Sequence, residues 1–311
     1  MKIVFCCTNT KAEPWLEGFR KALPGVDIWE WQAAPQGQTP KLADHAVVWS
    51  PPQSFIDEQT QLQNIFNIGA GVDALLKLNM PPSMNIVRLN DAGMSVQMAE
   101  YVCHAVIRHF REFDQYEKDA AVQRWSYRKP MLRADFSVGI LGAGVLGSHV
   151  ARTLQMFEFP VNVWSRSHKH MEGVQSFSGA AQLSEFLNAT RVLVNLLPLT
   201  PETENILNHA NLSQLQQGAY LINVARGRHL VEEDLLNLLA TGHMSGATLD
   251  VFREEPLPQG HAFWQHPQIT VTPHTSARTL RDESIAQIAG KIKAVYAGQA
   301  IEGRVDKTRG Y

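Results

Sequence analysis

The sequence predicts an α/β protein with two doubly wound parallel-sheet domains, and three observations predict this fold class. Short apolar runs recur along the chain, helical patterns separate them, and a glycine-rich turn follows one of the runs near the middle of the chain. Continuous apolar runs are typical of strands buried on both faces, as in parallel sheets. With 311 residues, the chain is long enough for two domains.

The smaller domain is expected to begin with residues 1–100. Residues 15–22 have a helical pattern, and apolar runs predict strands at residues 2–7, 45–49, 62–68 and 85–89. The last helical pattern, at residues 279–297, is expected to return to this domain. The domain would then be discontinuous and consist of residues 1–100 and 280–311.

A long helical pattern over residues 93–118 leads to a polar stretch at residues 119–135 that carries Trp125 and Tyr127. A stretch of this length without periodicity suggests an extended arm rather than a core element. The arm could be a surface loop or a contact with a second subunit.

Residues 101–279 are expected to form the second domain. Helical patterns such as residues 232–240 alternate with apolar runs, which predict strands at residues 161–164, 191–197, 219–224, 247–251 and 269–272. Strands that alternate with helices in this way favour a doubly wound parallel sheet.

The stretch FSVGILGAGVLGSHV, residues 136–150, contains a GxGxxG motif between a predicted strand and a predicted helix. In this context Gly142 permits a tight turn, Gly144 lets the backbone approach a pyrophosphate, and Gly147 lets the helix pack closely on its strand. The helix N-terminus offers N–H groups to phosphates. A Rossmann-type dinucleotide site is therefore predicted; a purely structural turn or another nucleotide is the alternative. Its residues are Gly142, Gly144, Val145, Leu146 and Gly147.

The choice of cofactor depends on the end of the strand that follows the glycine motif. A carboxylate there would bind the adenosine ribose of NAD, but this chain has Ser165 and Arg166, with His168 and Lys169 nearby. A guanidinium attracts a 2′-phosphate through charge-assisted, bidentate hydrogen bonds. The prediction is NADPH in preference to NADH; the alternative is a solvated arginine with no role in this choice.

Composition and charge narrow the possible partners. The formal net charge is −2, so nucleic acid is not expected as a partner. Cys6, Cys7 and Cys103 fit neither a disulfide framework nor a zinc spacing, so reduced thiols in a cytoplasmic protein and no metal are expected. The first apolar run is too short for a signal peptide, and no segment is long enough to span a bilayer.

Three segments that follow predicted strands carry residues suited to chemistry. They are NVARG with Arg226, LDVFREEPLP with Asp250 and Glu255, and TPHTSA with His274. The carboxyl edge of such a sheet is where ligands bind. On position alone, Arg226 could equally be a surface residue, and a lone histidine is more often structural.

Together with VGILGAGVLGS and PLTPETENIL, these segments resemble the signature blocks of the D-isomer-specific 2-hydroxyacid dehydrogenase family. VVWSPP at residues 47–52, GAGVD at residues 69–73, WSR and the VDKTRGY tail resemble its short reductases. The resemblance covers most of the chain. It implies a Rossmann-type cofactor domain inserted into a smaller flavodoxin-like substrate domain, and a homodimer formed through the cofactor domains.

The resemblance also assigns residues. It implies that His274 donates a proton, which suits an imidazole because its unperturbed pKa lies near working pH. Glu255, rather than Glu254, would pair with it, and Arg226 would hold the substrate carboxylate. The cofactor would be lined by Leu197, Pro198, Leu199, Val224, Ala225 and Asp250. The substrate would meet Trp49, which could equally be a core residue, and the backbone of Ala70, Gly71 and Val72.

The activity implied is the NADPH-dependent reduction of glyoxylate to glycolate and of hydroxypyruvate to D-glycerate. One alternative is a D-2-hydroxyacid dehydrogenase for another 2-oxo acid such as phenylpyruvate. A second is a non-catalytic, nucleotide-sensing protein resembling the corepressors of this fold, which fold alone does not exclude.

Overall fold

The computed structural model describes residues 1–35 and 37–310; Gln36 and the last tail residue, Tyr311, lie outside the described residues. The chain divides into two compact units. Unit 1 contains residues 1–93 and the chain from Thr279 onward, and unit 2 contains Met94–Arg278. The first division falls earlier than the expected residue 100, because Asp91, Ala92 and Gly93 have positive φ angles and helix α3 begins directly after them.

Unit 1 is built on a parallel sheet with the strand order β2-β1-β3-β4-β5. This is the flavodoxin-like order. The strands are β1 (Lys2–Cys7), β2 (Asp27–Glu30), β3 (His45–Trp49), β4 (Asn64–Asn67) and β5 (Asn85–Val87). Its helices are α1 (Glu13–Ala22), α2 (Gln53–Glu58), the 3₁₀ turn η1 (Leu75–Lys77) and α9 (Arg281–Tyr296).

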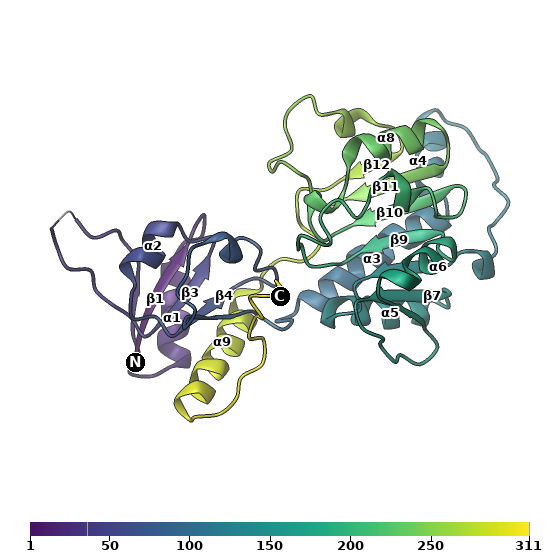
Figure 1. Cartoon of the computed structure of the whole chain (residues 1–311). Helices are drawn as coiled ribbons and strands as arrows, with labels where there is room; N and C mark the ends of the chain where they lie inside the picture. Colours follow the sequence, from purple (N-terminus) through teal and green to yellow (C-terminus); the bar gives the residue numbers. More distant parts are fainter. Residues whose placement is uncertain (36, 311) are drawn as a thin grey trace. The chain divides into compact units, whose positions relative to one another are not determined.

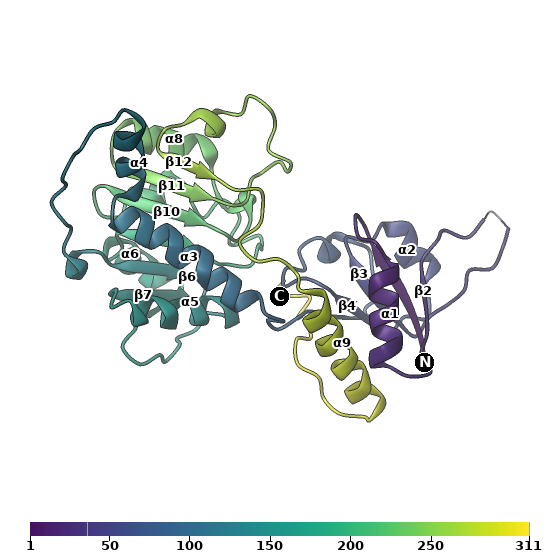
Figure 2. The same ribbon diagram turned by 180° about the vertical axis from the view of Figure 1, so that it is seen from behind.

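The two faces of this sheet are covered by different helices (Figures 1 and 2). Val4 and Cys6 of β1 pack with Phe55 of α2, whereas the alternate residue Phe5 stacks near Trp15 of α1. Helix α9 lies beside α1, and a Cβ at Gly18 would come within 2.4 Å of Cδ1 of Ile285. The C-terminal helix is therefore an integral layer of unit 1.

The segment after α9 pairs with the outer strand of the same sheet. Arg304 forms an antiparallel bridge with Val87 of β5, and Val305 N–H donates to the carbonyl of Ile86 over 2.9 Å. The open edge of β5 is thereby covered, which removes a row of unpaired backbone groups.

Unit 2 contains a seven-stranded parallel sheet in the described residues, with the order β12-β11-β10-β9-β6-β7-β8. Six of these strands follow the Rossmann order, and β12 extends the sheet. The strands are β6 (Val138–Leu141), β7 (Val161–Ser165), β8 (Gln175–Ser178), β9 (Val192–Asn195), β10 (Ala219–Asn223), β11 (Met244–Leu249) and β12 (Ile269–Val271).

Helices cover both faces of this sheet (Figure 1). Helices α3 (Met94–Phe110) and α5 (Val145–Met156) pack on the face that carries Val138 and Ile140, and α8 (Glu232–Ala240) packs on the face that carries Leu141 and Leu221. The other helical segments are α4 (Phe113–Ala121), α6 (Leu183–Asn188), α7 (His209–Leu212) and the 3₁₀ turns η2 (Arg133–Asp135), η3 (Ala180–Gln182), η4 (Gly227–His229) and η5 (Ala262–Gln265). Among the residues described, no helix combines the length and the apolar character needed to cross a bilayer.

Three details differ from the sequence-based expectations. The expected helix at residues 93–118 is broken into α3 and α4, because Glu112 has a φ of +52°. Strands β2 and β8 were not expected, since their short sequences DIWE and QSFS contain no continuous apolar run. The expected arm begins later than residue 119, because Asp119 is a buried residue of α4 whose carboxylate accepts a hydrogen bond from Arg128 over 2.7 Å.

Candidate active site

The strands of unit 2 end in register at one edge of the sheet. Pairing between neighbouring strands places the ends of six strands in a single row. The glycine turn and the segments that the sequence analysis identified follow directly after these strand ends. The turns that carry Gly142, Arg166, Arg226 and His274 therefore leave the sheet at the same edge. The row consists of Trp164, Leu141, Asn195, Asn223, Leu249 and Val271.

The glycine turn has the geometry that a pyrophosphate site requires. Gly142 has a φ of +104°, and a Cβ there would lie 2.8 Å from the carbonyl oxygen of Leu196. A Cβ at Gly147 would lie 1.9 Å from the carbonyl oxygen of Gly142. Gly144 has open space around it, and α5, which begins at Val145, has no side-chain cap. These residues fit a dinucleotide, because backbone N–H groups at the helix start remain available to phosphate oxygens.

The segment after β7 carries the residues expected to select the cofactor. Ser165 donates a hydrogen bond from Oγ to the carbonyl of Ser167 over 2.8 Å, which shapes the turn. Arg166 is exposed and lies near Glu202, whose pKa is held below its ordinary value by a hydrogen bond from Thr200, by the backbone and by the charge of Arg166. A phosphate bound by Arg166 would thus be close to a carboxylate on the loop that follows β9.

Two buried asparagines at strand ends shape the cofactor-lining turns. Asn195 Nδ2 donates to Asn223 Oδ1 over 3.0 Å, and Asn195 Oδ1 accepts from the N–H of Leu197. Asn223 Oδ1 accepts from the N–H of Ala225, and its Nδ2 donates to the carbonyl of Arg226 over 3.1 Å. Sequence reasoning missed this pair, although both side chains interrupt otherwise apolar strands, a signal that could have found them.

Arg226 follows β10 and precedes the turn η4. Its Nη1 donates to the carbonyl of Ala225 over 2.7 Å. A Cβ at Gly227 would lie 1.8 Å from the carbonyl carbon of Phe252. The glycine therefore lets the Arg226 segment close onto the backbone of the segment that carries Glu255.

Replacing Gly227 with alanine is expected to destabilise the protein by about 3 kcal/mol, because the backbone at Phe252 must move to admit the methyl group. The thermal midpoint should fall, as measured by circular dichroism. Gly290→Ala in α9 is the control, since a Cβ at Gly290 meets nothing within 4 Å and alanine favours a helix. Equal midpoints for Gly227→Ala and the unaltered protein would contradict the close approach.

His274 and Glu255 form a hydrogen-bonded pair. His274 Nδ1 lies 2.7 Å from Glu255 Oε2, and Glu255 Oε1 accepts a hydrogen bond from the N–H of Phe252 over 3.0 Å. Burial alone would raise the pKa of Glu255, but the bonds from His274 and Phe252 and the charges of His274 and Arg226 outweigh it, so the pKa is lower than usual. Glu255 is therefore ionised near neutral pH and orients the imidazole, leaving Nε2 for a substrate.

The carboxylate of Asp250 organises the turn that carries His274. Its Oδ1 accepts from Thr272 Oγ1 over 2.6 Å and from the N–H of Thr275 over 2.8 Å, and its Oδ2 accepts from the N–H of Ser276 over 2.8 Å. The N–H of His274 donates to the carbonyl of Asp250 over 2.9 Å. These bonds hold His274 at a φ of +52°, a conformation that non-glycine residues seldom adopt.

Tyr101 of α3 extends this network, because its hydroxyl is hydrogen-bonded to Thr272 Oγ1. Burial raises the pKa of Tyr101 to about 12. The hydrogen bond with Thr272 lowers this pKa, and the charge of Asp250 raises it further. The hydroxyl is thus protonated at neutral pH. Sequence reasoning missed Tyr101 and Thr272, and only their positions in the fold identify them.

The residues expected on unit 1 also lie together. A Cβ at Gly69 would lie 2.2 Å from Cζ3 of Trp49, so the indole packs directly on the start of the GAGVD loop. Asn67 Nδ2 donates to the carbonyls of Gly69 and Gly71 over 2.9 Å each, and this shapes the loop that contains Ala70 and Val72.

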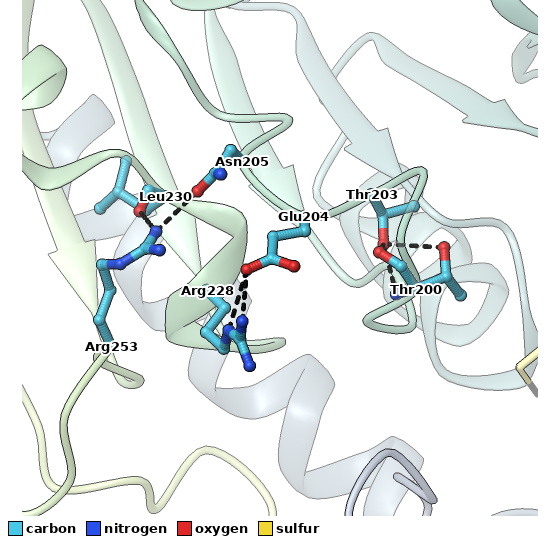
Figure 3. Close-up of polar contacts among 7 residues, drawn as sticks. All are labelled: Thr200, Thr203, Glu204, Asn205, Arg228, Leu230 and Arg253. Atoms are coloured by element: carbon cyan, nitrogen blue, oxygen red, sulfur yellow. Dashed lines mark hydrogen bonds and ion pairs between the residues drawn. The ribbon is translucent and has the colours of Figure 1, made fainter. Parts of the chain in front are cut away.

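Contacts outside the sheet join the PLTPETENIL loop to the segments that follow β10 and β11 (Figure 3). Arg228 of η4 pairs with Glu204 over 2.7 Å, and Arg253 donates to Asn205 Oδ1 over 2.7 Å and to the carbonyl of Leu230 over 2.8 Å. Within the loop, Thr203 Oγ1 accepts from the N–H of Thr200 over 2.8 Å. The loop that follows β9 is therefore held to the segments on its neighbours β10 and β11.

A Rossmann sheet with a glycine turn, a paired histidine and a cation at one edge defines a dinucleotide-dependent α/β oxidoreductase. Residues 103–276 match the family model of the D-isomer specific 2-hydroxyacid dehydrogenase NAD binding domain. The chain belongs to the D-isomer specific 2-hydroxyacid dehydrogenase family.

Full-length relatives agree with this membership. The chain is 47% identical to glyoxylate/hydroxypyruvate reductase A of Serratia proteamaculans, with 100% of both sequences covered. A D-isomer specific 2-hydroxyacid dehydrogenase from Xanthobacter autotrophicus, solved with NADPH and MES, is 37% identical with a TM-score of 0.94. An NADPH-dependent glyoxylate/hydroxypyruvate reductase from Sinorhizobium meliloti, solved with NADP and sulfate, is 35% identical with a TM-score of 0.92. Each structural match covers 100% of this chain and 99% of the other.

Proposed function

We propose that this protein is an NADPH-dependent reductase that converts glyoxylate to glycolate and hydroxypyruvate to D-glycerate. The observation that carries the proposal is the His274–Glu255 pair, 2.7 Å apart, at the same sheet edge as Arg226 and the glycine turn. The names of the relatives supply the substrates, small 2-oxo acids with one carboxylate beside one carbonyl.

The side chains divide the chemistry between them. NADPH, when bound at the glycine turn, supplies a hydride to the carbonyl carbon of the 2-oxo acid. His274 donates a proton to the carbonyl oxygen, and Glu255 stabilises the charged imidazole before that transfer. Arg226 binds the substrate carboxylate and polarises the carbonyl. The proton thus leaves Nε2 of His274 as the carbonyl oxygen gains negative charge.

The remaining assignments are part of the same proposal. Unit 2 is the cofactor domain and unit 1 the substrate domain, where Trp49 lines the pocket and the N–H groups of Ala70, Gly71 and Val72 bind the carboxylate. The turns at 197–199 and 224–225 line the cofactor. Asp250 is proposed to approach the nicotinamide carboxamide, in addition to holding the His274 turn.

Replacing Arg166 with alanine is expected to reduce the preference for NADPH over NADH by about tenfold or more, because a charge-assisted bond to the 2′-phosphate is lost. kcat/KM measured with each cofactor at saturating glyoxylate gives the preference. Lys169→Ala is the comparison, since Lys169 lies on the same exposed segment. An unchanged preference in Arg166→Ala, with a reduced one in Lys169→Ala, would move phosphate recognition to the lysine.

The activity is tested by following absorbance loss of NADPH and NADH with glyoxylate, hydroxypyruvate and phenylpyruvate. Fast loss with NADPH and the two small acids is the expected result. Faster turnover of phenylpyruvate would assign the protein to another 2-oxo acid. Nucleotide binding without turnover of any acid would favour a sensing protein over an enzyme.

We further propose a homodimer formed through unit 2, in the cytoplasm. Trp125 and Tyr127 of the arm are 101% and 88% exposed, and Leu132 is exposed as well. Apolar side chains displayed together at such exposure are typical of surfaces that bind another protein. Light scattering should give twice the monomer mass for the unaltered protein and a smaller mass for Trp125→Asp; a monomer in both cases would refute the dimer.

A further inference from the structure

His229 is a fully buried histidine at the end of the turn η4, three residues after Arg226. Its Nδ1 lies 3.1 Å from the carbonyl oxygen of Arg226, and its Nε2 lies 3.3 Å from the carbonyl oxygen of Pro198. The imidazole therefore spans two turns that leave the sheet from the adjacent strands β10 and β9. A neutral imidazole has one N–H and donates to one of the two carbonyls while contacting the other; a protonated one donates to both. One turn carries Arg226, the cation proposed to bind the substrate carboxylate. The other turn lines the proposed cofactor site.

Each of the two carbonyls has a second donor from its own turn. The carbonyl of Arg226 also accepts from Asn223 Nδ2 over 3.1 Å, and the carbonyl of Pro198 accepts from Thr203 Oγ1 over 2.7 Å. These local bonds shape each turn separately. His229 connects one turn to the other inside the protein.

Backbone bonds join the two segments further along the chain, from the N–H of Asn205 to the carbonyl of Arg228 over 3.0 Å and from the N–H of Leu207 to the carbonyl of His229 over 2.9 Å. A pair of charged side chains joins them at the surface. The Arg228–Glu204 pair has side chains that are 46% and 32% exposed, and exposed ion pairs contribute little. A hydrogen bond at a buried site is worth more, because losing it leaves a polar group without water. The relative position of the two turns thus depends on the buried contact more than on the exposed pair shown in Figure 3.

We propose that His229 is a positioning residue that sets Arg226 against the cofactor-lining turn at Pro198. The proposal rests on the proposed function, since that function gives Arg226 and the turn at Pro198 their roles. His229 itself is assigned no contact with substrate or cofactor. Its Nδ1 side acts on the carboxylate-binding cation, and its Nε2 side acts on the cofactor turn. A histidine that only stabilised the fold would not separate these two effects.

Two substitutions of His229, each of which keeps one of its two contacts, test the proposal. An asparagine amide reaches the position of Nδ1, and a glutamine amide reaches that of Nε2. His229→Asn should keep the contact to Arg226 and raise KM for NADPH about tenfold. His229→Gln should keep the contact to Pro198 and lower kcat/KM for glyoxylate about tenfold, with KM for NADPH near that of the unaltered protein.

His243 provides a matched control. Its Nδ1 lies 3.2 Å from Gln217 Oε1 and its Nε2 lies 3.2 Å from the carbonyl oxygen of Leu212, so it also spans two oxygens. It precedes β11 and belongs to the opposite end of the sheet. His243→Asn and His243→Gln should lower the thermal midpoint without changing either kinetic constant of the folded enzyme.

The possible outcomes distinguish a failure of the role proposed for His229 from a failure of the proposed function. A raised KM for NADPH in His229→Asn together with a lowered kcat/KM for glyoxylate in His229→Gln would support the proposal. The same effects in both variants, or no effect in either, would overturn it. If both variants fail to fold, Thr203→Val provides the readout, since it loosens the same Pro198 carbonyl: a raised KM for NADPH alone supports the proposal, and unchanged constants overturn it. An unaffected Arg226→Ala enzyme would instead refute the role of Arg226, whatever the His229 variants do.

Discussion

Replacing His274 with alanine is expected to lower kcat for glyoxylate reduction by about 10²–10⁴-fold and to leave the Kd for NADPH almost unchanged. This is the usual contribution of a general acid to the rate, and the substitution removes only the proton transfer. The dinucleotide residues on β6 and α5 are separate from the turn that carries His274. Stopped-flow absorbance gives kcat, and NADPH fluorescence titration gives the Kd.

The adjacent glutamates provide a matched pair for the same prediction. Glu255→Gln removes the charge 2.7 Å from His274 Nδ1 and should lower kcat, whereas Glu254→Gln changes an exposed neighbour and should not. The pKa of Glu255 is lower than usual, so the pair persists as the pH falls until Glu255 protonates below the ordinary glutamate value. A loss of NADPH binding in His274→Ala would show that His274 has a different role.

Replacing Arg226 with alanine is expected to lower kcat/KM for glyoxylate by about 10²-fold or more, as the loss of a donor to a developing oxyanion does. KM should rise as well, because the guanidinium also holds the carboxylate in the ground state. Steady-state kinetics over a wide range of glyoxylate concentrations separates the two constants.

Arg228→Ala is the control for this substitution. Arg228 lies on the same turn, is also a cation, and pairs with Glu204 at the surface. Its removal should change kcat/KM by less than about threefold, since exposed ion pairs contribute about 0–1 kcal/mol. If Arg228→Ala impaired the enzyme as strongly as Arg226→Ala, general disruption of η4 would explain both results.

The buried strands could be predicted from sequence because their apolar runs are continuous. The limits expected for β3 (residues 45–49) and α8 (residues 232–240) coincide with those observed. Strands β2 and β8 could not be predicted, since their four-residue sequences, DIWE and QSFS, contain no continuous apolar run and resemble loops. The break at Glu112 depends on a left-handed residue that no glycine or proline marks.

In the candidate site, too, residues with a local sequence pattern could be predicted and residues that depend on distant partners could not. Gly142, Gly144 and Gly147 could be recognised because each satisfies a steric requirement that no other residue meets. Residues such as Tyr101 and His229 act through partners more than 30 positions away in the chain, at Thr272 and Pro198. Their pairing follows from strand order, so no local pattern could reveal it.

The antiparallel bridge between Arg304 and Val87 has a consequence for biosynthesis. Unit 2 is continuous from Met94 to Arg278 and can fold as soon as its last strand leaves the ribosome. The β1–β5 segment of unit 1 is made before unit 2, but its layer α9 and the cover of its β5 edge are made after unit 2. At translation rates of roughly 5–20 residues per second, the nascent β1–β5 segment waits on the order of ten seconds for its partners. Shielding by a chaperone should therefore matter more for the β1–β5 segment of unit 1 than for unit 2.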